Sequence, residues 1–306
     1  MLINSSNHLF ELAREGELRL SGWPARLYPL LAVLYGLFSP LLGSVFAAIP
    51  VGILIFLMGR DTFETGGLYS SAFGLTAILI LGFGPIYFLI RFWLYVFERR
   101  SLWTLGLESQ GWLSRYLRGG GWGLVMICIS MGVPALLGFS TYDVGGGSLL
   151  WMVGTALGVL LGWIIQGGAE ELLFRGFIFQ TIGVRFGMLS GILVSSLLFA
   201  LLHIFNQDVN LLAMANLTLF GVFSCLYAAR EGSLWGVFAL HSAWNWAQAN
   251  LFGVQVSGVP VRLDTILKIR EAGPAWLVGG GFGPEGGVVV TVVLLVGIAV
   301  LLSRAK

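Results

Sequence analysis

The stretch that decides the fold runs from Leu149 to Gln180 and has the sequence LLWMVGTALGVLLGWIIQGGAEELLFRGFIFQ. A membrane-spanning helix needs about 20 predominantly apolar residues, and this stretch of 32 residues exceeds that length. Its only charged side chains are Glu170, Glu171 and Arg175. The sequence therefore predicts a membrane-spanning helix that carries charges at membrane depth.

The composition of the whole chain agrees with a membrane protein. Of its 306 residues, 57% are hydrophobic and only 10% are charged, and the mean hydropathy is +0.88. Soluble proteins carry about 25% charged residues, so this chain lacks the polar surface that a soluble globule needs. The formal net charge of +2 and the scattered basic residues predict no nucleic-acid partner. We therefore expect the chain to fold within a lipid bilayer rather than in water.

Apolar stretches of spanning length recur along the chain, and eight of them are candidates. They predict an all-α fold, a polytopic transmembrane helical bundle of about eight spans. The candidates are residues 27–58, 69–97, 122–139, 149–180, 189–204, 211–229, 234–251 and 288–302.

The spans divide the chain into five segments. We expect an N-terminal tail at 1–26, three spans within 27–140, four core spans within 149–251, a polar loop at 252–285, and a last span with a short tail at 286–306. The polar loop carries Pro260, Pro274 and a GGGFGPEGG run, which predict flexible backbone.

The basic residues also predict an orientation. In an eight-span arrangement, eleven Lys and Arg residues fall on the side that holds both termini, and four fall on the opposite side. Cytoplasmic connections carry the excess of Lys and Arg, so both termini are predicted to be cytoplasmic. We expect a multi-pass integral protein of a bacterial-type inner membrane or plasma membrane.

Charges inside spans point to a functional site, because they cost several kcal/mol in the membrane. Glu170 and Glu171 are the only two of the fifteen acidic residues predicted to lie within a span rather than in a tail, a loop or a span edge. Arg175 follows Glu171 by four residues, which places the two on one helical face in the favourable order for an ion pair. Glu170 lies about 100° around the helix and has no local cation. One carboxylate is therefore predicted to be paired and the other to be available for chemistry.

Two of the three histidines lie within spans or at their ends. His241 is followed four residues later by Asn245, so an imidazole and an amide share one helical face. His203 is followed three residues later by Asn206, which is close enough to share its face. These side chains extend the set of polar groups expected at membrane depth.

Three motifs in this part of the chain resemble those of the CAAX-protease and bacteriocin-processing (CPBP, or Abi) family of membrane endopeptidases. This family includes the eukaryotic protease that trims prenylated CAAX proteins. Its pattern is EExxxR, then FxxxH, then HxxxN or HxxxB on successive core helices. The corresponding residues here are Glu170, Glu171 and Arg175, then Phe199 and His203, then His241 and Asn245, and the resemblance covers residues 149–251.

The resemblance implies an intramembrane endopeptidase whose substrate is a membrane-associated peptide or protein, either prenylated and CAAX-like or bacteriocin-like. A carboxylate such as Glu170 can take a proton from water, and His241 with Asn245 can donate to the oxygen that becomes negative during hydrolysis. By resemblance, His203 holds or polarises the water. Glu171 and Arg175 are expected to form a supporting pair that fixes the helix.

Zinc chemistry is an open alternative within the same function. Glu170, His203 and His241 would form a set of two histidines and one glutamate with an open fourth position, and Glu171 would then be the base. The absence of an HExxH motif and the presence of Asn245, a poor zinc ligand, favour catalysis without a metal. The cofactor prediction is therefore none, or zinc.

Two other classes of function compete with a protease. A proton-coupled transporter would place similar residues at the membrane midplane, but it predicts repeated halves, and EExxxR has no counterpart in the first half. A non-catalytic scaffold of the same fold would more naturally have lost one of the polar motif residues. On a simple eight-span count, Glu170, His203 and His241 lie at different depths. They can meet only if the helix breaks near Gly167 and Gly168 or if the helices are strongly offset.

Overall fold

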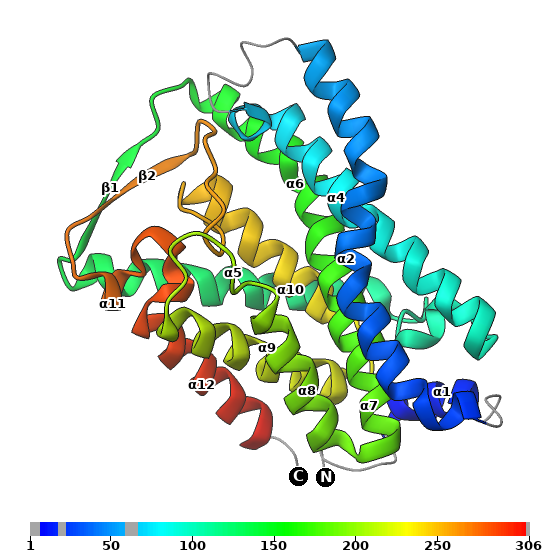
Figure 1. The fold of residues 1–306 in the computed structure, drawn as a ribbon. Helices are drawn as coiled ribbons and strands as arrows, with labels where there is room; N and C mark the ends of the chain where they lie inside the picture. Colours follow the sequence, from blue (N-terminus) through cyan, green and yellow to red (C-terminus); the bar gives the residue numbers. More distant parts are fainter. Residues whose placement is uncertain (1–6, 18–22, 59–66, 304–306) are drawn as a thin grey trace.

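The computed structural model describes residues 7–17, 23–58 and 67–303, and these form a helical bundle with one small two-stranded sheet (Figure 1). The helices are α1 (His8–Glu17), α2 (Trp23–Met58), α4 (Ala72–Trp93), α5 (Trp112–Leu136), α6 (Leu149–Glu171), α7 (Phe179–Phe186), α8 (Met188–Leu201), α9 (Leu211–Glu231), α10 (Trp235–Trp246), α11 (Ala275–Val278) and α12 (Val288–Ser303). The all-α prediction is confirmed.

Five helical stretches in the described part of the chain are long and apolar enough to cross a membrane. They are Leu27–Leu57, Ala72–Glu98, Trp112–Leu136, Leu149–Phe186 and Leu211–Glu231. Two shorter apolar helices, α8 and α12, coincide with two further predicted spans. The predicted span at 234–251 corresponds to α10 and the π-helical turn Ala247–Leu251 that extends it. The total of eight spans stays a prediction.

Three features differ from the expected segments. Helix α5 begins at Trp112, ten residues before the predicted span, so Arg115 lies in the helix rather than in a connection. The predicted N-terminal tail contains α1, whose Leu9 and Phe10 are fully buried. The predicted polar loop contains helix α11 and strand β2 (Leu267–Glu271), which pairs antiparallel with β1 (Ser140–Val144).

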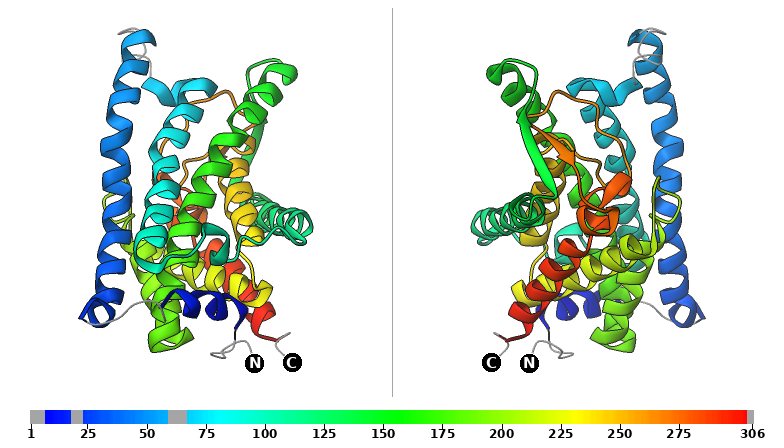
Figure 2. Two further views of the ribbon diagram at one scale, coloured as in Figure 1. Left: turned by 90° about the vertical axis from the view of Figure 1, so that its right-hand side faces the viewer. Right: turned by 90° about the vertical axis from the view of Figure 1, so that its left-hand side faces the viewer.

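The helices that position the site pack in sequence across the bundle. Helix α2 packs on α4, α4 on α6, α6 on α10, and α10 on α5. Helices α2, α4 and α6 lie side by side, whereas α5 crosses their direction and is seen nearly end-on in Figure 2. Helix α10 is thus enclosed between α5 and α6.

Glycines allow α10 to approach its neighbours this closely. A Cβ atom at Gly119 of α5 would lie 1.9 Å from the carbonyl oxygen of Gly236 in α10, and one at Gly167 of α6 would lie 2.8 Å from the backbone nitrogen of Ser242. Only glycine permits such contact between helix backbones. These contacts bring α6, which carries Glu170, directly against α10, which carries His241.

Helix α6 does not break at its glycine pair. It continues to Glu171, and a π-helical stretch (Leu172–Ile178) then leads into α7. Such π-helical turns occur frequently at functional sites. Of the two predicted alternatives, a break near Gly167 does not occur, and the tilted, offset helices of Figure 1 bring the site residues to one cavity.

Candidate active site

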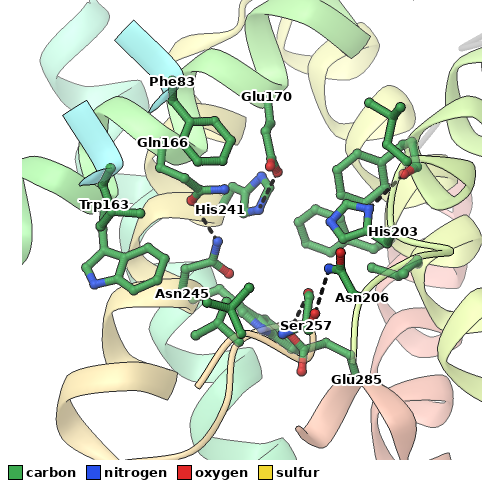
Figure 3. Close-up of a pocket in the computed structure, with 18 of the residues that line it drawn as sticks. Phe83, Trp163, Gln166, Glu170, His203, Asn206, His241, Asn245, Ser257 and Glu285 are labelled. Carbon is green, nitrogen blue, oxygen red and sulfur yellow. Dashed lines mark hydrogen bonds and ion pairs between the residues drawn. The ribbon is translucent and has the colours of Figure 1, made fainter. Parts of the chain in front are cut away.

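A cavity of about 380 Å³ lies between α4, α6, α8, α9, α10 and the segment that precedes α12. Its volume is within the range of about 300–1,000 Å³ that is usual for ligand pockets. Most of its lining is apolar, and the polar groups among the residues that line it come from six separate parts of the chain (Figure 3). They are Gln166, Glu170, His203, Asn206, Asn216, His241, Asn245, Ser257 and Glu285.

The predicted pair between Glu171 and Arg175 forms behind the cavity. Arg175 Nη1 lies 3.0 Å from Glu171 Oε1, and both side chains are completely buried. The guanidinium carbon lies 4.6 Å from the ring centroid of Phe199 and 5.7 Å from that of Phe220. A cation over aromatic faces is stabilised by the ring quadrupole, so Phe199 of the FxxxH motif packs against the pair.

His241 connects this buried pair to the cavity. Its Nδ1 atom lies 2.7 Å from Glu171 Oε1, the same oxygen that accepts from Arg175. An ionised carboxylate only accepts hydrogen bonds, so His241 Nδ1 carries a hydrogen. Arg175 holds the Glu171 carboxylate, and the hydrogen bond from Nδ1 to that carboxylate fixes the orientation of the imidazole ring. The other ring nitrogen of His241, Nε2, faces Glu170.

Glu170 lies on the cavity side of the same imidazole. Its Oε2 atom is 3.6 Å from His241 Nε2, which is too far for a direct hydrogen bond. A water molecule that bonds to both groups fits this spacing. The side chain of Glu170 is 14% exposed, whereas that of Glu171 is 0% exposed. The geometry thus separates one accessible carboxylate from one buried carboxylate, as the helical spacing predicted.

Asn245 lies on the same wall, one helical turn after His241. Its Nδ2 atom donates to Gln166 Oε1 at 2.9 Å. Gln166 precedes Glu170 by four residues on α6, so it faces the cavity beside the carboxylate (Figure 3). An amide nitrogen has two hydrogens, and the bond to Gln166 orients Asn245 while using one of them.

His203 lies across the cavity from Glu170 and His241 (Figure 3). Its Nδ1 atom lies 2.8 Å from the carbonyl oxygen of Phe199, so Nδ1 donates and Nε2 is an acceptor in the neutral ring. The Phe199 ring is in contact with both histidines, with centroids 4.9 Å from His203 and 6.1 Å from His241. His203 therefore belongs to the cavity but not to the Glu170–His241 cluster.

Glu285 completes the wall on the side of His203, and the sequence did not single it out. The residue is only 7% exposed. Its Oε1 atom accepts from the nitrogen and the hydroxyl of Ser257 at 3.2 and 3.1 Å, and Oε2 accepts from Gln248 Nε2 at 2.7 Å. Burial raises the pKa of this carboxyl to about 7. Its sequence signal was an isolated acid in the GPEGG run before the last span.

The three predicted zinc ligands are not gathered around one point. Among residues 7–17, 23–58 and 67–303, no group of three or more His, Cys, Asp or Glu side chains is arranged to hold a metal ion. Glu171, the predicted base of the zinc alternative, is buried and bonded to both Arg175 and His241. The residues present do not fit a zinc site of that composition.

Comparison with known proteins identifies the segment that contains these residues. Residues 152–247 match the family model described as type II CAAX prenyl endopeptidase Rce1-like. This segment, about a third of the chain, is therefore similar to the Rce1-like family. No curated protein and no solved structure matches the chain. The Rce1-like segment includes all three motifs, from Glu170 to Asn245, which confirms the resemblance. The similarity of this segment to the Rce1-like family supports an intramembrane endopeptidase activity on a peptide or protein substrate.

Proposed function

We propose that this Rce1-like protein hydrolyses a peptide bond near the C-terminus of a prenylated, CAAX-like substrate, with Glu170 as the base. One observation carries the proposal. Glu170 faces the cavity next to His241 Nε2, and the other nitrogen of that ring is fixed by the buried Glu171–Arg175 pair. The similarity of residues 152–247 to a family of prenyl endopeptidases supports the choice of substrate class.

The proposed reaction begins with a water molecule beside Glu170 Oε2 and His241 Nε2. Glu170 takes a proton from this water, and the oxygen attacks the carbonyl carbon of the scissile bond. A C–O bond forms and the carbonyl oxygen becomes negative. Glu170 then transfers its proton to the leaving nitrogen as the C–N bond breaks. Atoms and charges balance without another reactant.

Two donors are proposed for the negative oxygen. His241 Nδ1–H is already bonded to Glu171, so Nε2 donates only when the ring is doubly protonated. The ring lies between the carboxylates of Glu170 and Glu171. The second donor is the Asn245 hydrogen that is not bonded to Gln166. Preorganised donors of this kind are each worth about 10² to 10³ in kcat.

His203 is proposed to position the substrate or the water from the opposite wall. Its Nε2 atom can accept a hydrogen bond from a peptide N–H or from water, because Nδ1 donates to Phe199. This role requires no direct contact with Glu170.

The test is cleavage of a fluorogenic prenylated CAAX peptide by the purified protein in detergent. Glu170→Gln preserves the shape of the side chain but removes the base, and we expect no cleavage above background. Asp143→Asn, on an exposed position of the two-stranded β1–β2 sheet, is the matched control and should cleave at the wild-type rate. Each variant is first shown to be folded by its thermal unfolding midpoint.

A zinc chelator separates the two mechanisms. Cleavage that persists in chelator and is lost in Glu170→Gln supports glutamate catalysis. Cleavage that is lost in chelator and restored by zinc would contradict it. A folded wild-type protein that cleaves neither prenylated nor unprenylated peptides would favour the non-catalytic scaffold instead.

A further inference from the structure

One wall of the active-site cavity comes from a tight turn outside the segment that is similar to the Rce1-like family. Val256, Ser257 and Val259 line the cavity, and they lie beyond residue 247, where that segment ends. The backbones of Val256 and Val259 bond to each other at 3.1 and 2.9 Å. The two residues between them, Ser257 and Gly258, have positive φ angles of 48° and 81°. We call residues 256–259 the Ser257 turn.

The backbone conformation of Ser257 requires support from neighbouring groups. Residues other than glycine seldom adopt a positive φ angle, and they keep it only where the surrounding structure holds them. Glu285 Oε1 accepts from the nitrogen and the hydroxyl of Ser257 at 3.2 and 3.1 Å. Asn206 Nδ2 donates to the carbonyl oxygen of Ser257 at 2.7 Å. Each polar group of Ser257 is therefore bonded to a residue from another part of the chain.

Asn206 connects the Ser257 turn to His203. The backbone nitrogen of Asn206 donates to the carbonyl oxygen of His203 at 3.0 Å, so the two residues close a turn that follows α8. Gly258 packs against the same segment, since a Cβ atom there would lie 2.3 Å from the carbonyl oxygen of Gln207. Figure 3 shows Asn206 between His203 and the Ser257 turn. The Ser257 turn thus supports the cavity wall that carries His203.

Glu285 connects the Ser257 turn to α10. Its Oε2 atom accepts from Gln248 Nε2 at 2.7 Å, and Gln248 Oε1 accepts from Trp244 Nε1 at 2.8 Å. Trp244 belongs to α10, and Gln248 belongs to the π-helical turn that extends this helix. Hydrogen bonds therefore run from α10 through Glu285 to the Ser257 turn. A single side chain links the helix that carries His241 with the wall on the other side of the cavity.

We propose that Glu285 is a positioning residue for substrate binding. By holding the Ser257 turn, it fixes the spacing between the wall that carries His203 and the wall that carries Glu170. This inference rests on the proposed function, in which His203 positions the substrate or the water. The role of Glu285 is indirect, because both of its oxygens accept hydrogen bonds within the protein. Glu170 and His241 are held by separate contacts, so substrate binding should weaken more than the chemical step.

Glu285→Gln tests the proposal with two measurements. Glutamine keeps the shape of the side chain, but one of its two terminal groups is a donor and would face a donor of Ser257 or Gln248. KM for the fluorogenic prenylated peptide should rise about tenfold, with kcat within about twofold of wild type. Hydrogen exchange, followed by mass spectrometry, should become at least about fivefold faster at residues 256–259. Glu271→Gln, at an exposed position of β2, is the matched control and should change neither quantity.

A second variant tests whether Glu285 acts through the Ser257 turn. Ser257→Gly keeps the positive φ angle and removes only the hydroxyl, so KM should rise about threefold. If the two residues act as one unit, the double variant should have the same KM as Glu285→Gln. A KM that rises by the product of the two single factors would show that Glu285 acts by another route and would overturn the proposal. The thermal unfolding midpoint of each variant first establishes that it is folded.

A binding measurement separates this inference from the proposed function. In the Glu170→Gln protein the labelled peptide is not cleaved, and its Kd is measured by fluorescence anisotropy. Adding Glu285→Gln should raise this Kd about tenfold. If wild type cleaves no peptide, the proposed function fails, while Kd and hydrogen exchange still decide the role of Glu285.

Three results would overturn the positioning role. Unchanged hydrogen exchange in Glu285→Gln would show that this side chain does not hold the Ser257 turn. Faster exchange with unchanged KM and Kd would show that the turn does not contribute to substrate binding. A prenylated peptide that does not bind to the folded protein would remove both this inference and the proposed function.

Discussion

Glu285 makes the stability of this protein depend on pH, and Glu285→Gln should reduce that dependence. Burial raises the pKa of the carboxyl from its ordinary value of 4.5 to about 7. Below pH 4.5 the carboxyl is protonated in the folded and in the unfolded chain. Between pH 4.5 and 7 the unfolded chain loses the proton while the folded chain keeps it, so the free energy of unfolding falls as pH rises.

The magnitude follows from the two pKa values. At 1.36 kcal/mol for each pH unit, the interval from 4.5 to about 7 corresponds to a loss of about 3 kcal/mol by pH 8. For a chain of this size, this is on the order of 5–10 °C in the unfolding midpoint. The three donors from Ser257 and Gln248 hold the carboxylate in place when it is ionised. Glutamine keeps the shape of the side chain and cannot lose a proton.

The assay is thermal unfolding monitored by tryptophan fluorescence between pH 5 and 8. The midpoint of wild type should fall across this range, and that of Glu285→Gln should fall by less. Asp264→Asn, at an exposed position in the segment before β2, should behave as wild type does. If Glu285→Gln retains the full wild-type dependence on pH, the buried carboxyl is not its source and our reasoning is refuted.

Three further outcomes are expected. Arg175→Met should lower the free energy of unfolding by about 3–5 kcal/mol, because it leaves Glu171 buried without its cation; a denaturant titration that shows less than 1 kcal/mol would contradict this. Gly119→Val should prevent recovery of folded protein, because the new Cβ atom would lie 1.9 Å from the carbonyl oxygen of Gly236 in α10. The control Gly120→Ala should be recovered as folded protein, because its Cβ atom would lie at an ordinary distance of 3.8 Å from its nearest neighbour. Asn245→Ala should lower kcat about 10² to 10³-fold with little change in KM, and an unchanged kcat would remove this amide from the proposed oxyanion site.

The sequence alone determined the features that depend on composition and on local helical geometry. A low charged fraction and long apolar stretches predict membrane helices, because burying polar groups in lipid is costly. The spacing of Glu171 and Arg175 predicts their ion pair, because residues four apart on a helix are neighbours. The same reasoning separated Glu170 from that pair before any tertiary contact was known.

Only the tertiary structure decided how distant segments meet. The position of His241 between Glu170 and Glu171 depends on how α6 and α10 are offset, and glycines set that offset through backbone contact. The burial of Glu285 likewise depends on where the chain between α10 and α12 folds back over the cavity. A helical period fixes neighbours within one helix, but contacts between helices arise from packing, which no single segment of the sequence specifies.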